Sequence, residues 1–160
     1  MLPALPLFDE LLDKPLVASL ATFNPDGSVH VVAIWFLRDG HDLLMGTNAG
    51  SRKARNLARD ERATVMVHDS RGGFDVCGVT LVGAATIVPP PESLELNHRV
   101  HLKYVTERGL ATASVAEFLA GDDVTIRFET ARWSFWDERY TAAARALRAS
   151  SETHVWPPGA

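Results

Sequence analysis

The chain has 160 residues, of which 46% are hydrophobic and 22% are charged. This hydrophobic content suffices for a packed core, so the composition excludes a disordered chain and fits one domain or one subunit of a symmetric oligomer. A formal net charge of −4 argues against a general nucleic-acid binder, which presents a basic excess to the phosphate backbone. The single cysteine, Cys77, excludes an intrachain disulfide and a multi-cysteine metal site, and its apolar neighbours predict a buried thiol.

The N-terminal half is predicted to be mainly β-structure. A short helix is expected over Phe8–Leu12 and is ended by Lys14-Pro15. Three antiparallel strands follow, at 16–23, about 28–37 and 42–47. Between the first two, Asn24-Pro25-Asp26-Gly27 indicates a hairpin turn, because proline favours negative φ and glycine tolerates positive φ.

The later elements continue the sheet and then alternate with helices. The expected elements are a helix over 51–60, strands at about 62–68 and from the glycines at 72–73 to 88, helices over 92–108 and 114–119, a strand over 124–128 continued by 132–136, and a helix over 141–150. Gly78 and Gly83 inside the fifth strand indicate bulges or barrel corners. Six antiparallel strands with few helices predict a mainly β (α+β) fold, built as a small closed or nearly closed barrel.

No internal repeat or flexible linker is present, so we expect one domain over residues 1–150 and a polar C-terminal tail over 151–160. The opening residues Met1–Pro6 lack the basic region and long apolar core of a secretory signal. No stretch approaches the length of a membrane span. The expected location is therefore the cytoplasm, with no membrane partner.

The start of the helix at 51–60 has an unusual charge. Ser51 suits the N-cap position, and Arg52 and Lys53 follow it, where the positive end of the helix dipole disfavours cations. A bound phosphate would reverse that penalty, with backbone N–H groups, the hydroxyls of Thr47 and Ser51 and the two cations converging on it. The alternative is a solvated basic helix leaning on the sheet, and spacing alone leaves both interpretations open.

The order of motifs here resembles a known family. The chain has Thr47-Asn48, Ser51-Arg52-Lys53, Asn56-Leu57 and Arg59-Asp60, followed by the strand Ala63–Val67. This series is similar to that of the flavin-binding split β-barrels related to pyridoxamine 5′-phosphate oxidase, including the actinobacterial branch that uses the deazaflavin F420. The resemblance extends over roughly residues 10 to 90.

The resemblance implies a six-stranded antiparallel split β-barrel of the FMN-binding type with peripheral helices. It also implies a homodimer with cofactor sites at the subunit contacts. Lys53 and Arg52 would hold the cofactor phosphate, and strand residues would face its ring. The cofactor-binding residues that the resemblance implies are Lys53, Arg52, Ser51, Thr47, Asn48, Ile34, Trp35 and Ala33.

The identity of the cofactor depends on the second strand. Pyridoxamine phosphate oxidase itself carries an arginine and a lysine there, whereas this chain has only apolar residues and His30. The resemblance therefore implies FMN or F420, with F420 favoured. Three tryptophans lie in or beside predicted strands, namely Trp35, Trp133 and Trp136. They would either contact the face of a flat ring system or pack in the core.

The expected function is hydride transfer between FMN or F420 and a small unsaturated organic substrate, for which the ring carries the hydride. No catalytic side chain is assigned. His98 and His101 share a helical face but lack a further ligand, so no metal site is predicted. Two alternatives remain open: a non-catalytic flavin or F420 carrier of the same fold, and a dimeric domain whose basic helix meets an acidic partner surface.

Overall fold

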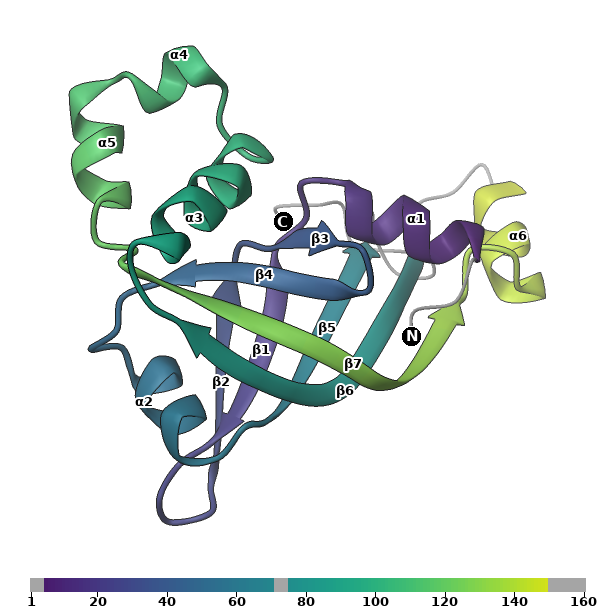
Figure 1. Ribbon diagram of the computed structural model, residues 1–160. Coiled ribbons are helices and arrows are strands. Elements are labelled where there is room, and N and C mark those ends of the chain that lie inside the picture. Colours follow the sequence, from purple (N-terminus) through teal and green to yellow (C-terminus); the bar gives the residue numbers. More distant parts are fainter. Residues whose placement is uncertain (1–4, 71–74, 150–160) are drawn as a thin grey trace.

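The computed structural model describes residues 5–70 and 75–149 (Figure 1). The predicted tail over 151–160 and the glycines at 72–73 lie outside the described residues. The strands are β1 (Ala18–Phe23), β2 (Val29–Ile34), β3 (Leu37–Asp39), β4 (Asp42–Thr47), β5 (Arg62–Ser70), β6 (Val76–Val88) and β7 (Val124–Asp137). The helices are α1 (Pro6–Asp13), α2 (Arg52–Arg59), α3 (Glu92–Leu102), α4 (Glu107–Leu110), α5 (Ala113–Leu119) and α6 (Ala142–Ala149).

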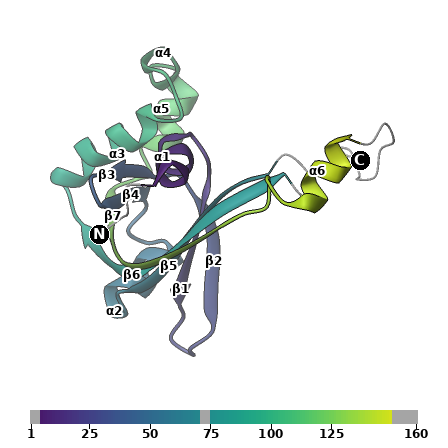
Figure 2. The same ribbon diagram turned by 90° about the vertical axis from the view of Figure 1, so that its right-hand side faces the viewer.

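The strands form one antiparallel sheet in the order β2-β1-β5-β6-β7-β4-β3. The sheet curls on itself, with α3, α4 and α5 at one end and α6 beyond the far tips of β6 and β7 (Figures 1 and 2). The predicted α+β antiparallel split barrel is confirmed. Two details differ, since this sheet has seven strands and its edges β2 and β3 stay unpaired with each other, so the barrel is open.

The extra strand arises because the predicted strand over 28–37 is broken at Trp35 and Phe36. At the break, the hydroxyl of Tyr104 forms hydrogen bonds with backbone groups in place of a neighbouring strand. It accepts a hydrogen bond from the Phe36 amide at 3.0 Å and lies 2.7 Å from the Leu16 carbonyl, to which it donates. Because buried backbone groups must be paired, this side chain permits the sheet to end and restart here.

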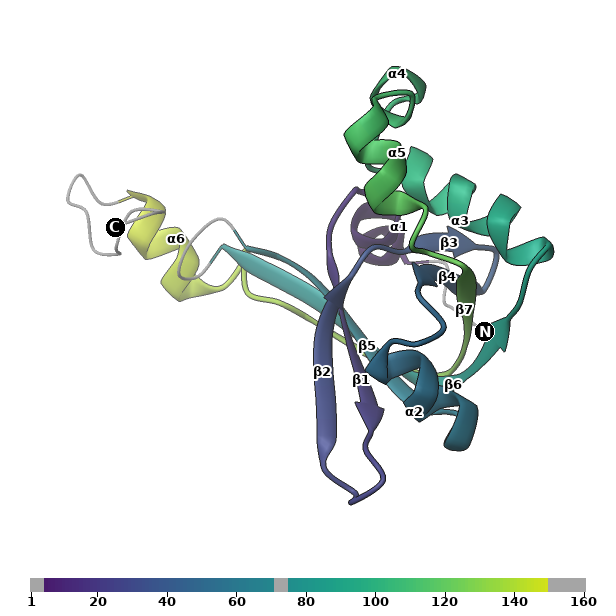
Figure 3. The same ribbon diagram turned by 90° about the vertical axis from the view of Figure 1, so that its left-hand side faces the viewer.

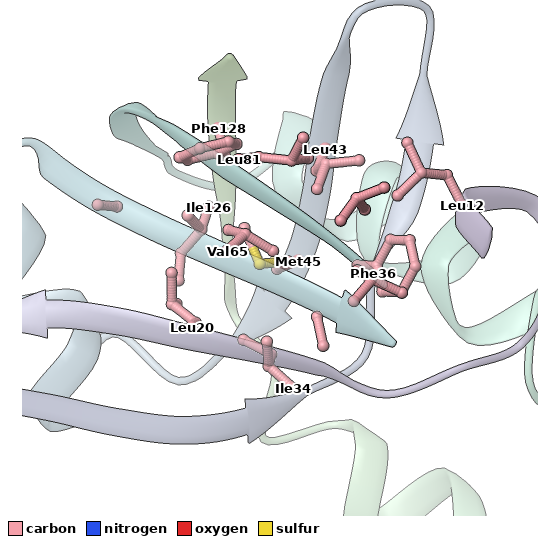
Figure 4. Packing of buried hydrophobic residues seen from close by; sticks show 14 of the residues in the cluster. Leu12, Leu20, Ile34, Phe36, Leu43, Met45, Val65, Leu81, Ile126 and Phe128 are labelled. Atoms are coloured by element: carbon pink, nitrogen blue, oxygen red, sulfur yellow. The ribbon is translucent and has the colours of Figure 1, made fainter. Parts of the chain in front are cut away.

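The core lies inside the curled sheet and contains alternate residues of β1, β4, β5, β6 and β7 (Figure 4). Leu20 of β1, Val65 of β5 and Leu81 of β6 are cross-strand neighbours and are fully buried. Phe8, Leu11 and Leu12 of α1 close one end of this core. Each such side chain contributes about 1.5 to 3 kcal/mol to folding.

The glycines of β6 differ in their roles. Gly83 lies at a register shift between β6 and β7, and a Cβ there would fall 1.9 Å from the Glu129 carbonyl oxygen. The predicted bulge at Gly83 is thus confirmed. Gly78 pairs in regular register with Trp136, whose ring lies where a Cβ would stand, 2.2 Å away at its nearest atom. Gly78 is therefore a site of close packing, and of the bulge or barrel corner predicted there the bulge is absent.

The helix predicted over 92–108 ends earlier, at Leu102. Thr106 then caps α4 by accepting a hydrogen bond from the Gly109 amide at 3.2 Å. Between the two helices, the Lys103 ammonium donates to the carbonyl of Leu12 at 2.7 Å and lies 3.6 Å from the centre of the Phe36 ring. This turn therefore fastens α3 to the end of α1. None of the helices in the described ranges combines the length and apolar character needed to cross a membrane.

Lys103 predicts a pH dependence of stability. Burial lowers the pKa of Lys103 to about 8 from its ordinary value of 10.5. Unfolding therefore takes up a proton between these two values, so stability rises as the pH increases through this window. From about pH 7 to about pH 9.5, Lys103 should raise the free energy of unfolding by about 1 to 2 kcal/mol.

Urea denaturation of the wild type and of Lys103→Met at both pH values measures this difference. The variant is expected to lack the rise. An identical pH dependence in the two proteins would show that the Lys103 pKa is not lowered by folding.

Candidate functional site

Helix α2 begins at the residue that the sequence predicts. Ser51 is its N-cap, and the Ser51 hydroxyl accepts a hydrogen bond from the Ala54 amide at 3.3 Å. The hydroxyl of Thr47, the last residue of β4, lies 3.3 Å from the same oxygen. No acidic side chain stands in the first turn, which carries Arg52 and Lys53. The two cations therefore add to the positive charge at the start of the helix, and no side chain of the first turn neutralises it.

A cleft of about 450 Å³ lies beside this helix start and within the range of about 300 to 1,000 Å³ typical of small-molecule sites. Figure 3 shows α2 and α5, which contribute to it, on the same side of β2. Its lining residues are Val17, Ala33, Ile34, Trp35, Gly46, Thr47, Lys53, Phe118, Leu119 and Asp122.

The cleft brings together five of the eight residues that the resemblance implied. Ala33, Ile34 and Trp35 supply an apolar wall at the end of β2, and Thr47 and Lys53 supply polar groups from β4 and α2. These two groups are separated in sequence and meet only in the folded chain. An apolar wall with a few convergent polar groups is typical of small-molecule and cofactor sites.

The ammonium of Lys53 has no hydrogen-bond or ion-pair partner among the described residues. Burial lowers its pKa below the usual value, and the charge of Asp122 opposes that shift in part. A partly buried cation without a partner is costly unless an anion approaches it. Lys53 is therefore suited to hold an anionic group of a ligand in the cleft.

Arg52 lies elsewhere. It lines a second groove of about 590 Å³ with residues of the β1–β2 turn and of α2, namely Asn24, Pro25, Asp26, Arg55, Asn56 and Arg59. In this groove Arg55 donates to the Gly50 carbonyl and Arg59 to the Phe23 carbonyl. The structure thus separates the two adjacent cations of the motif between two surfaces.

Ser51 and Asn48 also do not line the cleft. Ser51 caps α2, as described above. The side-chain amide of Asn48 donates to the Gly121 carbonyl at 3.2 Å, and its oxygen accepts from the Gly50 amide at 2.8 Å. Asn48 therefore fastens the loop before α2 to the segment before β7.

The three tryptophans with predicted ring-binding or core roles occupy different environments. Trp35 lines the cleft and stacks on Tyr104, with ring centres 4.6 Å apart and planes 5° apart. Trp133 packs edge-on against Phe8 of α1 at 5.3 Å. Trp136 packs over Gly78. Only Trp35 of these three lines the cleft.

Sequence reasoning missed five residues of the cleft: Val17, Gly46, Phe118, Leu119 and Asp122. Phe118 on α5 is 81% exposed although it lines the cleft, so its ring stands at the mouth. Asp122 reaches the cleft from the segment between α5 and β7. Its oxygen Oδ2 lies 3.1 Å from Nε2 of the buried His101. No local pattern marks these positions, because each reaches the cleft through long-range contacts.

Within residues 5–70 and 75–149, no group of three or more His, Cys, Asp or Glu side chains is arranged to hold a metal ion. His98 lies 3.9 Å from Glu107, whereas His101 lies 3.1 Å from Asp122. Cys77 is buried as predicted, and this burial raises the pKa of its thiol.

Solved structures share this fold. The conserved hypothetical protein Rv2991 from Mycobacterium tuberculosis is 27% identical, with a TM-score of 0.71 over 87% of this chain and 88% of that chain. A protein described as an F420 reductase is 29% identical, with a TM-score of 0.56 over 79% and 94% of the two chains. An FAD-binding protein from Mesorhizobium loti is 18% identical, with a TM-score of 0.60 over 84% and 94%, and this similarity shows the fold alone.

No curated protein matches the chain with significance. The family model described as pyridoxamine 5′-phosphate oxidase matches residues 5–137, which include every strand of the sheet and the whole lining of the cleft. The chain therefore belongs to the pyridoxamine 5′-phosphate oxidase family of split β-barrel proteins.

Proposed function

We propose that this protein is a flavin- or deazaflavin-dependent oxidoreductase that transfers a hydride between FMN or F420 and a small unsaturated organic substrate. The observation that carries the proposal is the cleft in which the ammonium of Lys53, without a partner among the described residues, lies beside the apolar wall of Ala33, Ile34 and Trp35. An anionic tail and a flat ring are the two features that such a cleft complements.

Each residue has a physical role in this proposal. Lys53 would bind the anionic group of the cofactor, and the Thr47 hydroxyl would donate to or accept from its polar tail. The strand residues and Trp35 would contact the ring and exclude water from one of its faces. Arg52, Ser51 and Asn48 lie beside the cleft rather than in its lining, so this proposal gives them no direct contact with the cofactor. The bound ring supplies the hydride.

F420 is favoured over FMN on two grounds. The second strand lacks the arginine and lysine that pyridoxamine phosphate oxidase uses, and β2 presents Val29, Val31 and Ala33 as exposed apolar side chains. In addition, a protein described as an F420 reductase is 29% identical to this chain over an alignment that covers 79% of it. The first observation concerns the wall of the site, where a ligand is selected by shape and polarity.

We also propose a cytoplasmic homodimer with the cofactor site at the subunit contact. Val31 is 59% exposed and lies in the middle of an uncovered apolar face of β2, and Ala33 of this face also lines the cleft. A second copy on this face would remove the apolar surface from water and close the cleft on one side. Sedimentation equilibrium of the full chain tests this, with a monomer at micromolar concentration as the contradicting result.

The proposed reaction is tested by mixing the protein anaerobically with reduced F420 or reduced FMN and a panel of activated alkenes and quinones. Substrate-dependent oxidation of the cofactor, lost with Lys53→Ala, would support the oxidoreductase. Tight binding without turnover of any substrate would instead support the carrier of the same fold.

A further inference from the structure

The cleft contains a second charged side chain that is not used in the proposal above. Asp122 lies in the lining together with Lys53, and the carboxylate influences the lysine pKa. The two groups nevertheless form no ion pair with each other in the described residues. A cation and a carboxylate that share a cleft without pairing are both available to a ligand.

The carboxylate of Asp122 is held in place by buried groups. Its Oδ2 lies 3.1 Å from Nε2 of His101, a side chain that is only 9% exposed. Its backbone carbonyl accepts a hydrogen bond from Asn97 at 2.8 Å, and its amide donates to the Leu119 carbonyl at 3.0 Å. The position of Asp122 is thus fixed by both its backbone and its side chain.

The surrounding segment is fastened to both sides of the cleft. On the α3 side, buried Asn97 also donates to the Val124 carbonyl at 3.1 Å and accepts from the Thr125 hydroxyl at 2.6 Å. On the α2 side, the Ala49 amide donates to Asp123 at 2.7 Å, next to the contact of Asn48 with Gly121. The carboxylate is therefore preorganised relative to Lys53, which lowers the entropic cost of binding a ligand between them.

One carboxylate oxygen stays available. Oδ2 contacts His101, whereas no donor among the described residues bonds to Oδ1, and the side chain is 29% exposed. A Cβ at position 46 would lie 3.1 Å from Oδ2. The absence of a side chain at Gly46 therefore gives this carboxylate the room that it occupies. Since an ionised carboxylate only accepts hydrogen bonds, the ligand must present a donor to it.

We propose that Asp122, positioned by His101, accepts a hydrogen bond from the imide N–H of the bound flavin or deazaflavin ring. This inference rests on the proposed function. The oxidised isoalloxazine ring has one N–H, which lies between two carbonyl groups. In this arrangement the apolar wall contacts the face of the ring and Lys53 binds the anionic tail of the cofactor. Asp122 is the remaining charged group of the lining, and its carboxylate can accept a hydrogen bond from the ring N–H.

Binding measurements with N3-methyl derivatives test the contact directly. The wild type is expected to bind FMN or F420 at least about tenfold more tightly than the N3-methyl form of the same cofactor, because methylation removes the donor. In Asp122→Ala the ratio of the two affinities, unmethylated over N3-methylated cofactor, should fall to about one. Glu117→Ala removes the same charge from an exposed site on α5 outside the cleft lining and should keep the wild-type ratio.

His101 is a positioning residue, and its variants separate that role from a merely structural one. His101→Gln keeps a donor for Asp122 and should preserve the ratio, whereas His101→Leu should reduce it. The reduction potential of the bound cofactor gives a second readout. A carboxylate beside the ring disfavours added electron density, so Asp122→Asn should raise the midpoint potential relative to the wild type.

The outcomes distinguish the two proposals. If the cofactor binds the wild type but the methylation ratio and the potential do not change in the Asp122 variants, the inference is overturned while the proposed function stands. If neither FMN nor F420 binds the wild type, both fail. Thermal unfolding of each variant checks that a changed ratio does not follow from a lost fold.

Discussion

Replacing Lys53 by alanine is expected to weaken the binding of F420 or FMN by about 10- to 100-fold. The physical reason is that Lys53 supplies the one partly buried ammonium of the cleft lining, whose pKa is lowered by burial and which lacks a partner among the described residues. A charge-assisted hydrogen bond to the cofactor's anionic group contributes about 1.5 to 3 kcal/mol, which corresponds to that change in affinity. Isothermal titration calorimetry measures it.

The neighbouring cation provides a matched control. Arg52→Ala removes the same charge from the next residue of α2, but from a side chain that lines the other groove. We expect a change of less than about fivefold, from weakened long-range attraction only. Equal losses in the two variants would mean that binding depends on the net charge of the helix start and not on the cleft.

Replacing Gly83 by alanine is expected to destabilise the protein by about 3 kcal/mol or more. The added Cβ would stand 1.9 Å from the Glu129 carbonyl oxygen, a backbone atom that cannot move without breaking the β6–β7 pairing at the register shift. Urea denaturation of the purified proteins gives the difference in the free energy of unfolding.

Gly121→Ala is the control for this variant, because the nearest atom to a Cβ there lies 3.5 Å away, at ordinary contact distance. Its effect should stay within about 0.5 kcal/mol. If Gly83→Ala is as stable as Gly121→Ala, the register shift at Val82 and Gly83 does not constrain the sheet in solution.

The features that the sequence predicts well are determined by neighbouring residues. Ser51 caps α2 through an amide three positions later. The turn over 24–27 closes with the Gly27 amide on the Asn24 carbonyl at 3.0 Å, and Gly27 has a φ of 82°. Alternation of apolar residues gives β1 and β5 with their buried faces. These signals are local, so no knowledge of the fold is needed to use them.

The features that the sequence does not predict depend on distant residues. The break after β2 exists because Tyr104 bonds to Phe36, 68 positions earlier. Asp122 faces the cleft because its segment is tied to the loop before α2, with 74 positions between Ala49 and Asp123. Arg52 and Lys53 are adjacent in the motif, yet the helix directs them to different surfaces, and only the packing of α2 shows which one meets the apolar wall.

The most direct test of the cofactor site is a parallel titration of cofactor-free protein with FMN and F420, followed by tryptophan fluorescence. We predict that one of them binds with a Kd of about one micromolar or tighter. Trp35→Phe should then lose more of the quenching than Trp133→Phe, since only Trp35 of the two lines the cleft. Failure of both cofactors to bind at micromolar concentration would contradict the proposal that this cleft is a flavin or deazaflavin site.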